Sequence, residues 1–421
     1  MFPIITLPEL ATWGQQLASL VPLAALLEFI DLQQKLHVFE LSGFNPAWSW
    51  ALTPEGARLI LSDEDSSDAC CLDRPARSAV LHCMDCKFGN FYPCSAPTTT
   101  RSYLRSTTPR IKLSNHWPNV LSPQARRNRL DVVVVRQSPP KIKTPGRVLR
   151  AIMGDTPPFL RVTVIIGWAL WLVLSCSSIL SGLYVATAYL AIIPVTSAAI
   201  DLRVVGKARQ LLAMDEPGEM DRLVVATNSV NSTDWYAFYG PKDTVNALLN
   251  RPLMRADRPA HPRIAAWLIR GCAAAQWGLI VASCVLQGWD AYAITIWIAF
   301  CSLVSTYIYP PERAVQDWLS SVCRVDLDSI RATFSSRRAM LAALIHLNPD
   351  QENTEWLDPI LSKSHQERKD WEAAVLAHSR SQPTHVAERD YWYKYVREGV
   401  AMGVQLQNEI KTLRHNEKKS C

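Results

Sequence analysis

A cluster of cysteines is the first feature of the sequence that could do chemistry. Cys83 and Cys86 have the two-residue spacing that lets both thiolates reach one zinc ion. Further candidate ligands stand nearby: Cys70, Cys71, His82 and Cys94. Their spacing is irregular, and no second two-residue pair exists. The sequence therefore favours reduced or S-acylated thiols over a zinc or redox centre, and we predict no metal site and no cofactor.

Carboxylates and aromatic side chains form the other candidate set. Asp326 and Asp328 are a close acidic pair beside an apolar stretch. A lone Asp-x-Asp without a second acidic motif is typical of a solvated surface. An aromatic patch combines four closely spaced residues: Trp235, Tyr236, Phe238 and Tyr239. Such a patch is typical of a ligand or interaction groove, of anchoring at a membrane interface, or of packing.

Standard catalytic motifs are absent from the sequence. It contains no Gly-rich phosphate loop, no Gly-x-Ser-x-Gly elbow and no His-Glu-x-x-His. We therefore predict no catalytic residues.

Two long apolar stretches dominate the middle of the chain. Val162 to Ile200 has no charged residue, and a single helix of this length would reach ~58 Å, about twice the hydrocarbon thickness of a bilayer. Two helices that fold back at Ser181-Gly182 fit better. The second stretch, Ile264 to Tyr309, splits at Gln287 to Asp290. The fold class predicted is a mainly α, polytopic membrane protein with four transmembrane helices in two hairpins, 158–200 and 264–309.

Basic residues predict the orientation. Lys and Arg flank both hairpins, whereas the two hairpin turns contain neither. Because basic residues accumulate on the cytosolic side, we predict that both termini are cytosolic. The cytosolic parts would be an N-terminal region (1–157) with the cysteine cluster and a basic linker, a middle loop (201–263) and a helical C-terminal region (310–421).

Composition narrows the protein classes. The 421 residues are 48% hydrophobic and 19% charged with a net charge of +6, which excludes disordered, collagenous and coiled-coil chains. The basic segment 101–150 favours contact with anionic lipid. Nucleic-acid binding is not predicted, because only Tyr103 and Trp117 could serve there as stacking platforms. Residues 17–30 are apolar but too short to span a bilayer, which predicts a core helix or a membrane-surface helix.

Two helix faces carry packing signals. In the third apolar helix, small residues share one face, which predicts close helix packing: Gly271, Ala275, Gly278 and Ala282. A heptad-like stripe in the tail predicts docking on a partner helix: Val396, Gly399, Gly403, Leu406, Ile410 and Leu413. Partners on the cytosolic side are expected, and a homo-oligomer is left open.

The last four residues suggest a localisation signal. Lys418 and Lys419 occupy the fourth and third positions from the end of the sequence, as in the dilysine retrieval signal of endoplasmic-reticulum membrane proteins. Such a motif is read by a receptor and is not an anchor. A solvated basic end is the alternative. We predict an endoplasmic-reticulum membrane location.

Two segments carry a resemblance. DWYAFYGPKDTVNALLNRPL (234–253) and YPPERAVQDWL (309–319) resemble segments of multi-pass membrane proteins of filamentous ascomycete fungi, a group with no established activity. Some of these are encoded beside secondary-metabolite enzymes, so the resemblance implies an accessory or scaffold role in such a pathway. The alternatives are a membrane enzyme that acts on a lipophilic substrate at the cytosolic face, using Trp235, Tyr236, Asp326 and Asp328, and a small-molecule transporter.

Overall fold

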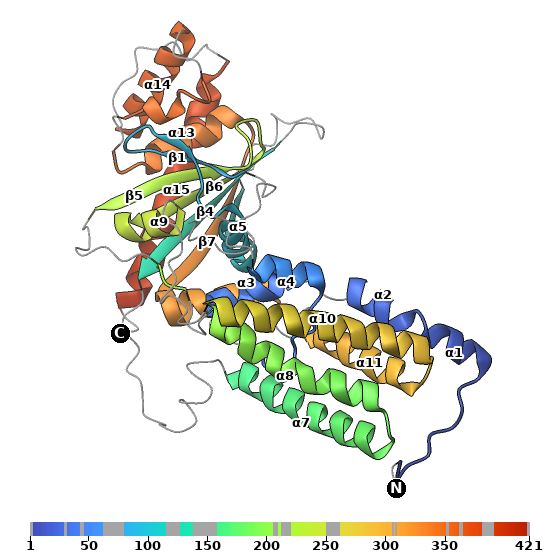
Figure 1. Cartoon of the computed structure of the whole chain (residues 1–421). Coiled ribbons are helices and arrows are strands. Elements are labelled where there is room, and N and C mark those ends of the chain that lie inside the picture. The colour runs from blue at the N-terminus through green and yellow to red at the C-terminus, as the bar shows by residue number, and fades with distance from the viewer. Residues whose placement is uncertain are drawn as a thin grey trace. The chain divides into compact units, whose positions relative to one another are not determined.

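A computed structural model gives the structure of the chain. It describes residues 3–28, 32–42, 46–61, 80–114, 127–137, 158–204, 209–211, 220–249, 262–304, 307, 310–350, 353–361, 365–380 and 391–418. The chain forms two compact units, one of helices and one built on a β-sheet (Figure 1). The helical unit collects Met1–Pro75, Lys141–Gln210 and Leu253–Cys323, and the sheet unit collects Ala76–Pro140, Leu211–Pro252 and Arg324–Cys421.

The helical unit contains the apolar stretches. Its elements are α1 (Thr12–Ala18), α2 (Val21–Glu28), α3 (Leu32–Ser42), α4 (Pro54–Leu61), α7 (Pro158–Leu180), α8 (Tyr184–Val204), α10 (Pro262–Leu286), α11 (Trp289–Leu303), α12 (Pro311–Trp318) and the π-helical turn η2 (Leu319–Cys323). In the described part of the chain, three helical stretches are long and apolar enough to cross a membrane: Val162–Leu180, Tyr184–Arg203 and Pro262–Leu286. The helix α11 is apolar but shorter.

The helices end and begin again at both predicted turn positions. The chain leaves α7 through Gly182, whose φ of +71° suits a residue without a Cβ. Between α10 and α11 it turns at Gln287 and Gly288. Asp290, in the first turn of α11, accepts a hydrogen bond of 2.8 Å from the backbone N–H of Ala186. An acidic side chain from one hairpin therefore caps the N-terminus of a helix in the other.

The packing face of α10 differs from the small-residue face predicted. Gly271 and Gly278 have no atom within 4 Å of a Cβ added to them, so among the described residues these two positions make no close helix contact. The buried face carries a mixture of small, apolar and polar residues: Ala265, Ile269, Cys272, Ala273, Gln276, Ile280, Ser283 and Cys284. Ile269, Gln276 and Ile280 therefore supply the larger side chains that pack inside the helical unit.

Gln276 holds an N-terminal loop inside the helical unit. Its side-chain oxygen accepts the N–H of Leu52 at 2.8 Å, and its nitrogen donates to Trp50 O at 3.1 Å and to Thr196 Oγ1 at 2.7 Å. The buried Trp48 lies where a Cβ on Gly167 would be. The described residues up to Leu61 therefore pack with the helices, whereas residues 80–137 of the predicted N-terminal region contribute to the sheet unit.

The sheet unit contains a mixed seven-stranded sheet in the described residues, which the mainly α prediction did not include. Its strands are β1 (His82–Asp85), β2 (Phe91–Pro93), β3 (Pro109–Ser114), β4 (Asn128–Gln137), β5 (Asp221–Thr227), β6 (Asp234–Pro241) and β7 (Val325–Phe334). Their order is β2-β1-β5-β6-β4-β7-β3, with β4/β6 and β3/β7 parallel and the other pairs antiparallel.

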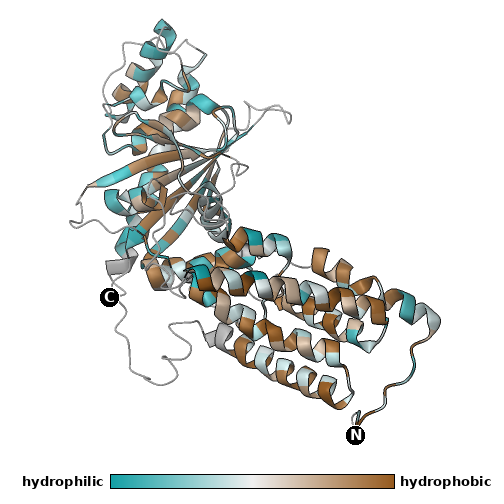
Figure 2. Ribbon diagram, viewed as in Figure 1, coloured by the Kyte–Doolittle hydropathy of each residue, from teal (hydrophilic) through white to brown (hydrophobic). Residues whose placement is uncertain are grey.

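Helices cover the sheet. The sheet unit also contains α5 (Pro97–Ser106), α9 (Lys242–Leu249), α13 (Arg337–Leu347), α14 (Gln366–Ser379), α15 (Tyr393–Lys418) and the 3₁₀ turn η3 (Glu355–Leu357). Alternate strand residues such as Val132 and Ile330 form a core with α13, α14 and α15. Figure 2 shows the apolar colour along these strands and along the membrane-length helices of the helical unit.

The predicted stripe in the tail docks on a helix of the chain itself. Val396, Leu406 and Ile410 of α15 are buried in the core shared with α13. A Cβ on Gly399 would lie 2.6 Å from the Cβ of Ala342 and would overlap the backbone oxygen of Ala339. The absence of a side chain at Gly399 therefore sets the approach of α15 to α13.

We expect Gly399→Ala to destabilise the protein, by about 1–3 kcal/mol, because the added methyl group meets backbone that cannot move aside. Thermal unfolding of the detergent-solubilised protein measures this effect. Gln405→Ala, at an exposed position of the same helix, is the control and should leave the melting temperature nearly unchanged. Equal melting temperatures for both variants would contradict the packing.

Candidate functional site

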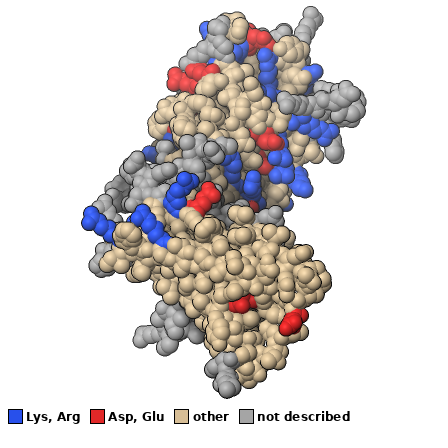
Figure 3. All heavy atoms as spheres, turned by 45° about the vertical axis from the view of Figure 1, so that its right-hand side comes forward, with Lys and Arg blue, Asp and Glu red and all other residues tan. Residues whose placement is uncertain are grey.

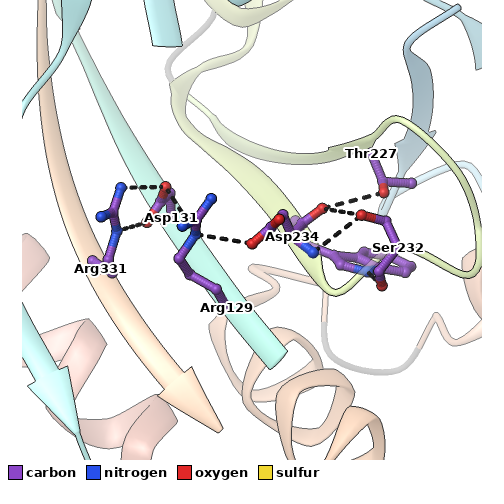
Figure 4. Close-up of polar contacts among 7 residues, drawn as sticks. Arg129, Asp131, Thr227, Ser232, Asp234 and Arg331 are labelled. Atoms are coloured by element: carbon purple, nitrogen blue, oxygen red, sulfur yellow. Dashed lines mark hydrogen bonds and ion pairs between the residues drawn. The ribbon is translucent and has the colours of Figure 1, made fainter. Parts of the chain in front are cut away.

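A row of alternating charges crosses one face of the sheet (Figure 4). Strand register places Asp131 of β4 directly opposite Arg331 of β7, and places Arg129 of β4 beside Asp234 of β6. All four side chains stand on the face opposite α13 and α15, because the residues that alternate with them face those helices. We call Arg129, Asp131, Asp234 and Arg331 the sheet-face cluster.

The sheet-face cluster is closely paired. Arg331 binds Asp131 through two hydrogen bonds, of 2.7 Å from Nε and 3.0 Å from a terminal nitrogen. The Nε of Arg129 lies 3.0 Å from Asp234 and 3.9 Å from Asp131. Asp131 is the most buried member, with a side chain 8% exposed, whereas that of Asp234 is 43% exposed.

Pairing decides what the sheet-face cluster can do chemically. The hydrogen bonds from Arg331 to Asp131 raise the pKa of the guanidinium further above its usual value. Each carboxylate is already engaged with an arginine. The cluster therefore links three strands and presents charged edges to solvent, which suits polar recognition better than proton transfer.

A turn beside the sheet-face cluster fixes the start of β6. The hydroxyl of Ser232 accepts the N–H of Asp234 and also contacts its carbonyl oxygen, both at 3.1 Å. Thr227, at the end of β5, donates to the same carbonyl at 3.4 Å, and the indole N–H of Trp235 donates to Ser232 O at 2.8 Å (Figure 4). These local hydrogen bonds position Asp234 toward Arg129.

A second ion pair is buried in the sheet unit. Asp85, at the end of β1, pairs with Arg222 of β5, and the Nε of Arg222 lies 3.2 Å from the carboxylate. Arg222 also donates to Asn246 of α9 at 2.5 Å, and Phe88 lies against it at 5.4 Å. Both charged side chains are more than nine-tenths buried. Sequence reasoning missed this pair, because its members are far apart in the chain.

The predicted aromatic patch is divided by its strand. β6 alternates its side chains, so Trp235 and Tyr239 stand on the face of α13 and α15, whereas Tyr236 and Phe238 stand on the other face. Trp235 and Phe238 are fully buried. The four residues therefore do not lie on one face, and Trp235 and Phe238 pack in the interior.

The acidic pair is placed differently from the solvated surface expected. Asp328 is 2% exposed and lies between Arg136 and Arg110, with the Nε of Arg110 at 2.8 Å. Asp326 shares its face of β7 two residues away and is partly buried. Trp235 is not beside Asp328 in the sheet register, in which Asp328 lies opposite Val134.

The cysteines of the Cys-x-x-Cys motif do not point to one ion. Cys86 belongs to the core beneath α13, whereas Cys83 stands on the opposite face, where a hydrogen bond with Cys94 and burial raise its pKa. Three residues along a strand reverse the direction of the side chain. In the described ranges no three His, Cys, Asp or Glu side chains are grouped to hold a metal, and Cys70 and Cys71 lie outside those ranges.

The predicted dilysine retrieval signal lies at the end of the described chain. Lys418 is the last residue of α15, and Lys419 lies outside the described residues. The basic segment before α7, residues 138–157, is also outside them.

Comparisons with known proteins give no relative. No protein-family profile, no curated protein and no solved structure matches the chain. The functional argument therefore depends on the chain's own geometry.

The loss of unfolding free energy on removing a carboxylate charge should increase with the burial of its ion pair. We expect Asp85→Asn to cost about 3–5 kcal/mol of unfolding free energy, because it leaves Arg222 buried and unpaired. Asp234→Asn should cost about 0–1 kcal/mol, because water solvates the exposed Arg129, and Asp131→Asn should fall between them. Chemical unfolding of the solubilised protein gives the three values. An Asp234→Asn loss as large as that of Asp85→Asn would refute the grading.

Proposed function

We propose that the chain is an integral membrane protein whose helical unit is the anchor and whose sheet unit is a docking domain on the cytosolic side. One observation carries the proposal: the helical unit turns large apolar side chains outward. Examples with exposed fractions above one half are Ile165 (58%), Val173 (65%), Trp267 (72%), Val285 (74%) and Ile296 (62%).

Polar side chains complete this pattern. Gln276, Thr196 and Ser283 are buried within the helical unit. In Figure 3 the surface over the membrane-length helices carries almost no charged side chain, whereas blue and red atoms gather over the sheet unit. A soluble protein rarely exposes so large an apolar area, but a helix bundle in hydrocarbon has this distribution.

Chain connectivity supports two hairpins with four crossings. The chain leaves the sheet after β4, forms α7 and α8, and returns at β5. It leaves again after α9, forms α10 and α11, and returns at β7. A bilayer cannot separate β4, β5, β6 and β7, because they are joined in one sheet. Each helical segment between these strands must therefore cross the bilayer an even number of times. The fourth crossing would be α11, whose 15 residues reach about 22 Å.

Charge supports the cytosolic side for the sheet unit. Arg203, Arg263, Arg313 and Arg324 stand near the ends of the hairpins that connect to the sheet, and neither turn has a Lys or Arg. Arg270, exposed near the start of α10, lies over the ring of Trp267 at 5.6 Å, an arrangement suited to the interface.

A docking role fits the site better than catalysis. The charges of the sheet-face cluster and of Asp328 are already paired, and the aromatic residues of β6 serve packing. We place the protein in the endoplasmic reticulum on the strength of Lys418 and Lys419. The resemblance noted above makes an accessory role in a fungal secondary-metabolite pathway the proposed context.

Membrane extraction tests the anchor. The full chain should stay in the membrane pellet after alkaline carbonate and enter the supernatant only with detergent, because the outward apolar side chains require hydrocarbon. Asn231, in the exposed turn between β5 and β6 and part of an Asn-Ser-Thr sequon, should carry no glycan. Release by carbonate would overturn the anchor, and a glycan on Asn231 would overturn the orientation.

The dilysine retrieval signal can be tested separately. Replacing Lys418 and Lys419 with Ser should move an N-terminally tagged protein from the endoplasmic reticulum to later secretory membranes, as seen by microscopy, because the retrieval receptor needs both lysines. Lys411→Ser removes a basic residue from an exposed position of the same helix and serves as the control. An unchanged distribution of the double variant would exclude the signal.

A further inference from the structure

The first described residues lie at the turn end of the helical unit. The N–H groups of Ile4 and Ile5 donate to Leu180 O, at the end of α7, at 2.9 and 3.1 Å. The indole N–H of Trp289, which begins α11, donates to Pro8 O at 2.8 Å. Residues 3–10 therefore contact both hairpin turns.

From there the chain runs along the helices. The hydroxyl of Tyr292 in α11 donates to Gly14 O in α1 at 2.8 Å. Next, Ala25 and Leu26 of α2 join the core that contains Ile280 and Trp297. As the residue number rises, the contacts therefore lie farther from the hairpin turns along the helices.

The chain then reaches the opposite end of the same helices. Leu36 and Phe39 of α3 pack in one core with residues from the last part of α8 and the first part of α10: Ala199, Ile200, Ile269 and Ala273. Glu40 forms a buried ion pair with Arg209, five residues beyond α8, at 3.3 Å. Glu40 is therefore at the end where the hairpins connect to the sheet.

We propose, on the basis of the proposed membrane anchor, that residues 12–28 are a fifth membrane-crossing segment, and that residues 3–10 lie on the side of the hairpin turns, away from the cytosol. Its partner on the outer face is lipid hydrocarbon. The side chains that meet it are Trp13, Leu17, Leu20 and Leu27, with exposed fractions of 68%, 45%, 66% and 79%.

The backbone of this segment is suited to hydrocarbon. The joint between α1 and α2 keeps its hydrogen bonds, because Ser19 donates to Gln15 O, Leu20 to Leu17 O and Ala24 to Leu20 O, at 3.0–3.2 Å. These three N–H groups therefore need no water partner. Residues 12–28 would reach about 25 Å as one helix, close to the ~30 Å hydrocarbon thickness.

The distribution of Lys and Arg independently supports the proposed crossing of residues 12–28. The first Lys or Arg of the sequence is Lys35, which lies in α3 beyond the crossing segment and donates to Ser49 O. Residues 1–34 thus match the hairpin turns, which also lack Lys and Arg. Acidic residues, such as Glu9, contribute little to orientation. For the N-terminal residues, this proposal differs from the sequence-based expectation that both termini are cytosolic.

The Trp48–Leu52 loop fits the same path. After Glu40 the chain returns among the helices, where Gln276 of α10 binds its backbone and also donates to the hydroxyl of Thr196 in α8. Irregular backbone at membrane depth is tolerated where protein surrounds it. The helix α4 then leads back toward the start of α10, since Ala57 and Ile60 pack with Ile269.

The test places one cassette at two positions of the full chain. The cassette holds an epitope tag and a glycosylation sequon on a flexible linker, and it is fused before Met1 or inserted in the serine-rich segment 62–68. In sealed microsomes, we expect an endoglycosidase-sensitive glycan and protease protection for the first cassette. The second should carry no glycan and should be cleaved by protease.

The outcomes separate the two proposals. Cassettes on opposite sides support the crossing, and a glycan on the second cassette alone would retain the crossing while inverting the proposed orientation. Cassettes on the same side, both cleaved or both glycosylated, overturn the crossing. Loss of the protein from carbonate-washed membranes overturns the anchor itself, and the crossing with it.

Discussion

Hydrogen bonds between strands that come from three separate stretches of the chain are the constraint on which the rest of the structure depends. β4 lies between β6 and β7, and each of these strands follows a different helical hairpin in sequence. Every buried backbone N–H and C=O group in such a ladder needs a hydrogen-bond partner on the neighbouring strand. Each hairpin must therefore bring the chain back to the same sheet. The even number of crossings that we propose for each hairpin follows from this requirement.

The helical unit is organised by a few polar groups among apolar ones. Gln276 satisfies the backbone of the Trp48–Leu52 loop, and Asp290 caps α8. A polar group without a partner in an apolar interior costs several kcal/mol, so each of these contacts fixes which segments are neighbours. The apolar side chains that remain face outward and define the proposed lipid surface.

Local patterns were predictable where the sequence itself sets the geometry. The helix breaks at both predicted turns are found in the structure. The strand β7 was not predicted, and β6 was interpreted only as an aromatic patch. Ionic and aromatic residues in these strands obscure the apolar alternation, and their partners come from distant parts of the chain. The sheet-face cluster and the Asp85–Arg222 pair were missed for the same reason, since only strand register brings their charges together.

The sequence by itself determined the apolar stretches, their turns and the side on which basic residues gather, because length, hydropathy and charge are properties of continuous segments. Tertiary structure alone decided that the Cys-x-x-Cys thiols point to opposite faces, that Gly399 rather than Gly271 is a contact between helices, and that residues 3–28 run along α11. Each of these depends on which surfaces meet, and a linear pattern does not contain that information.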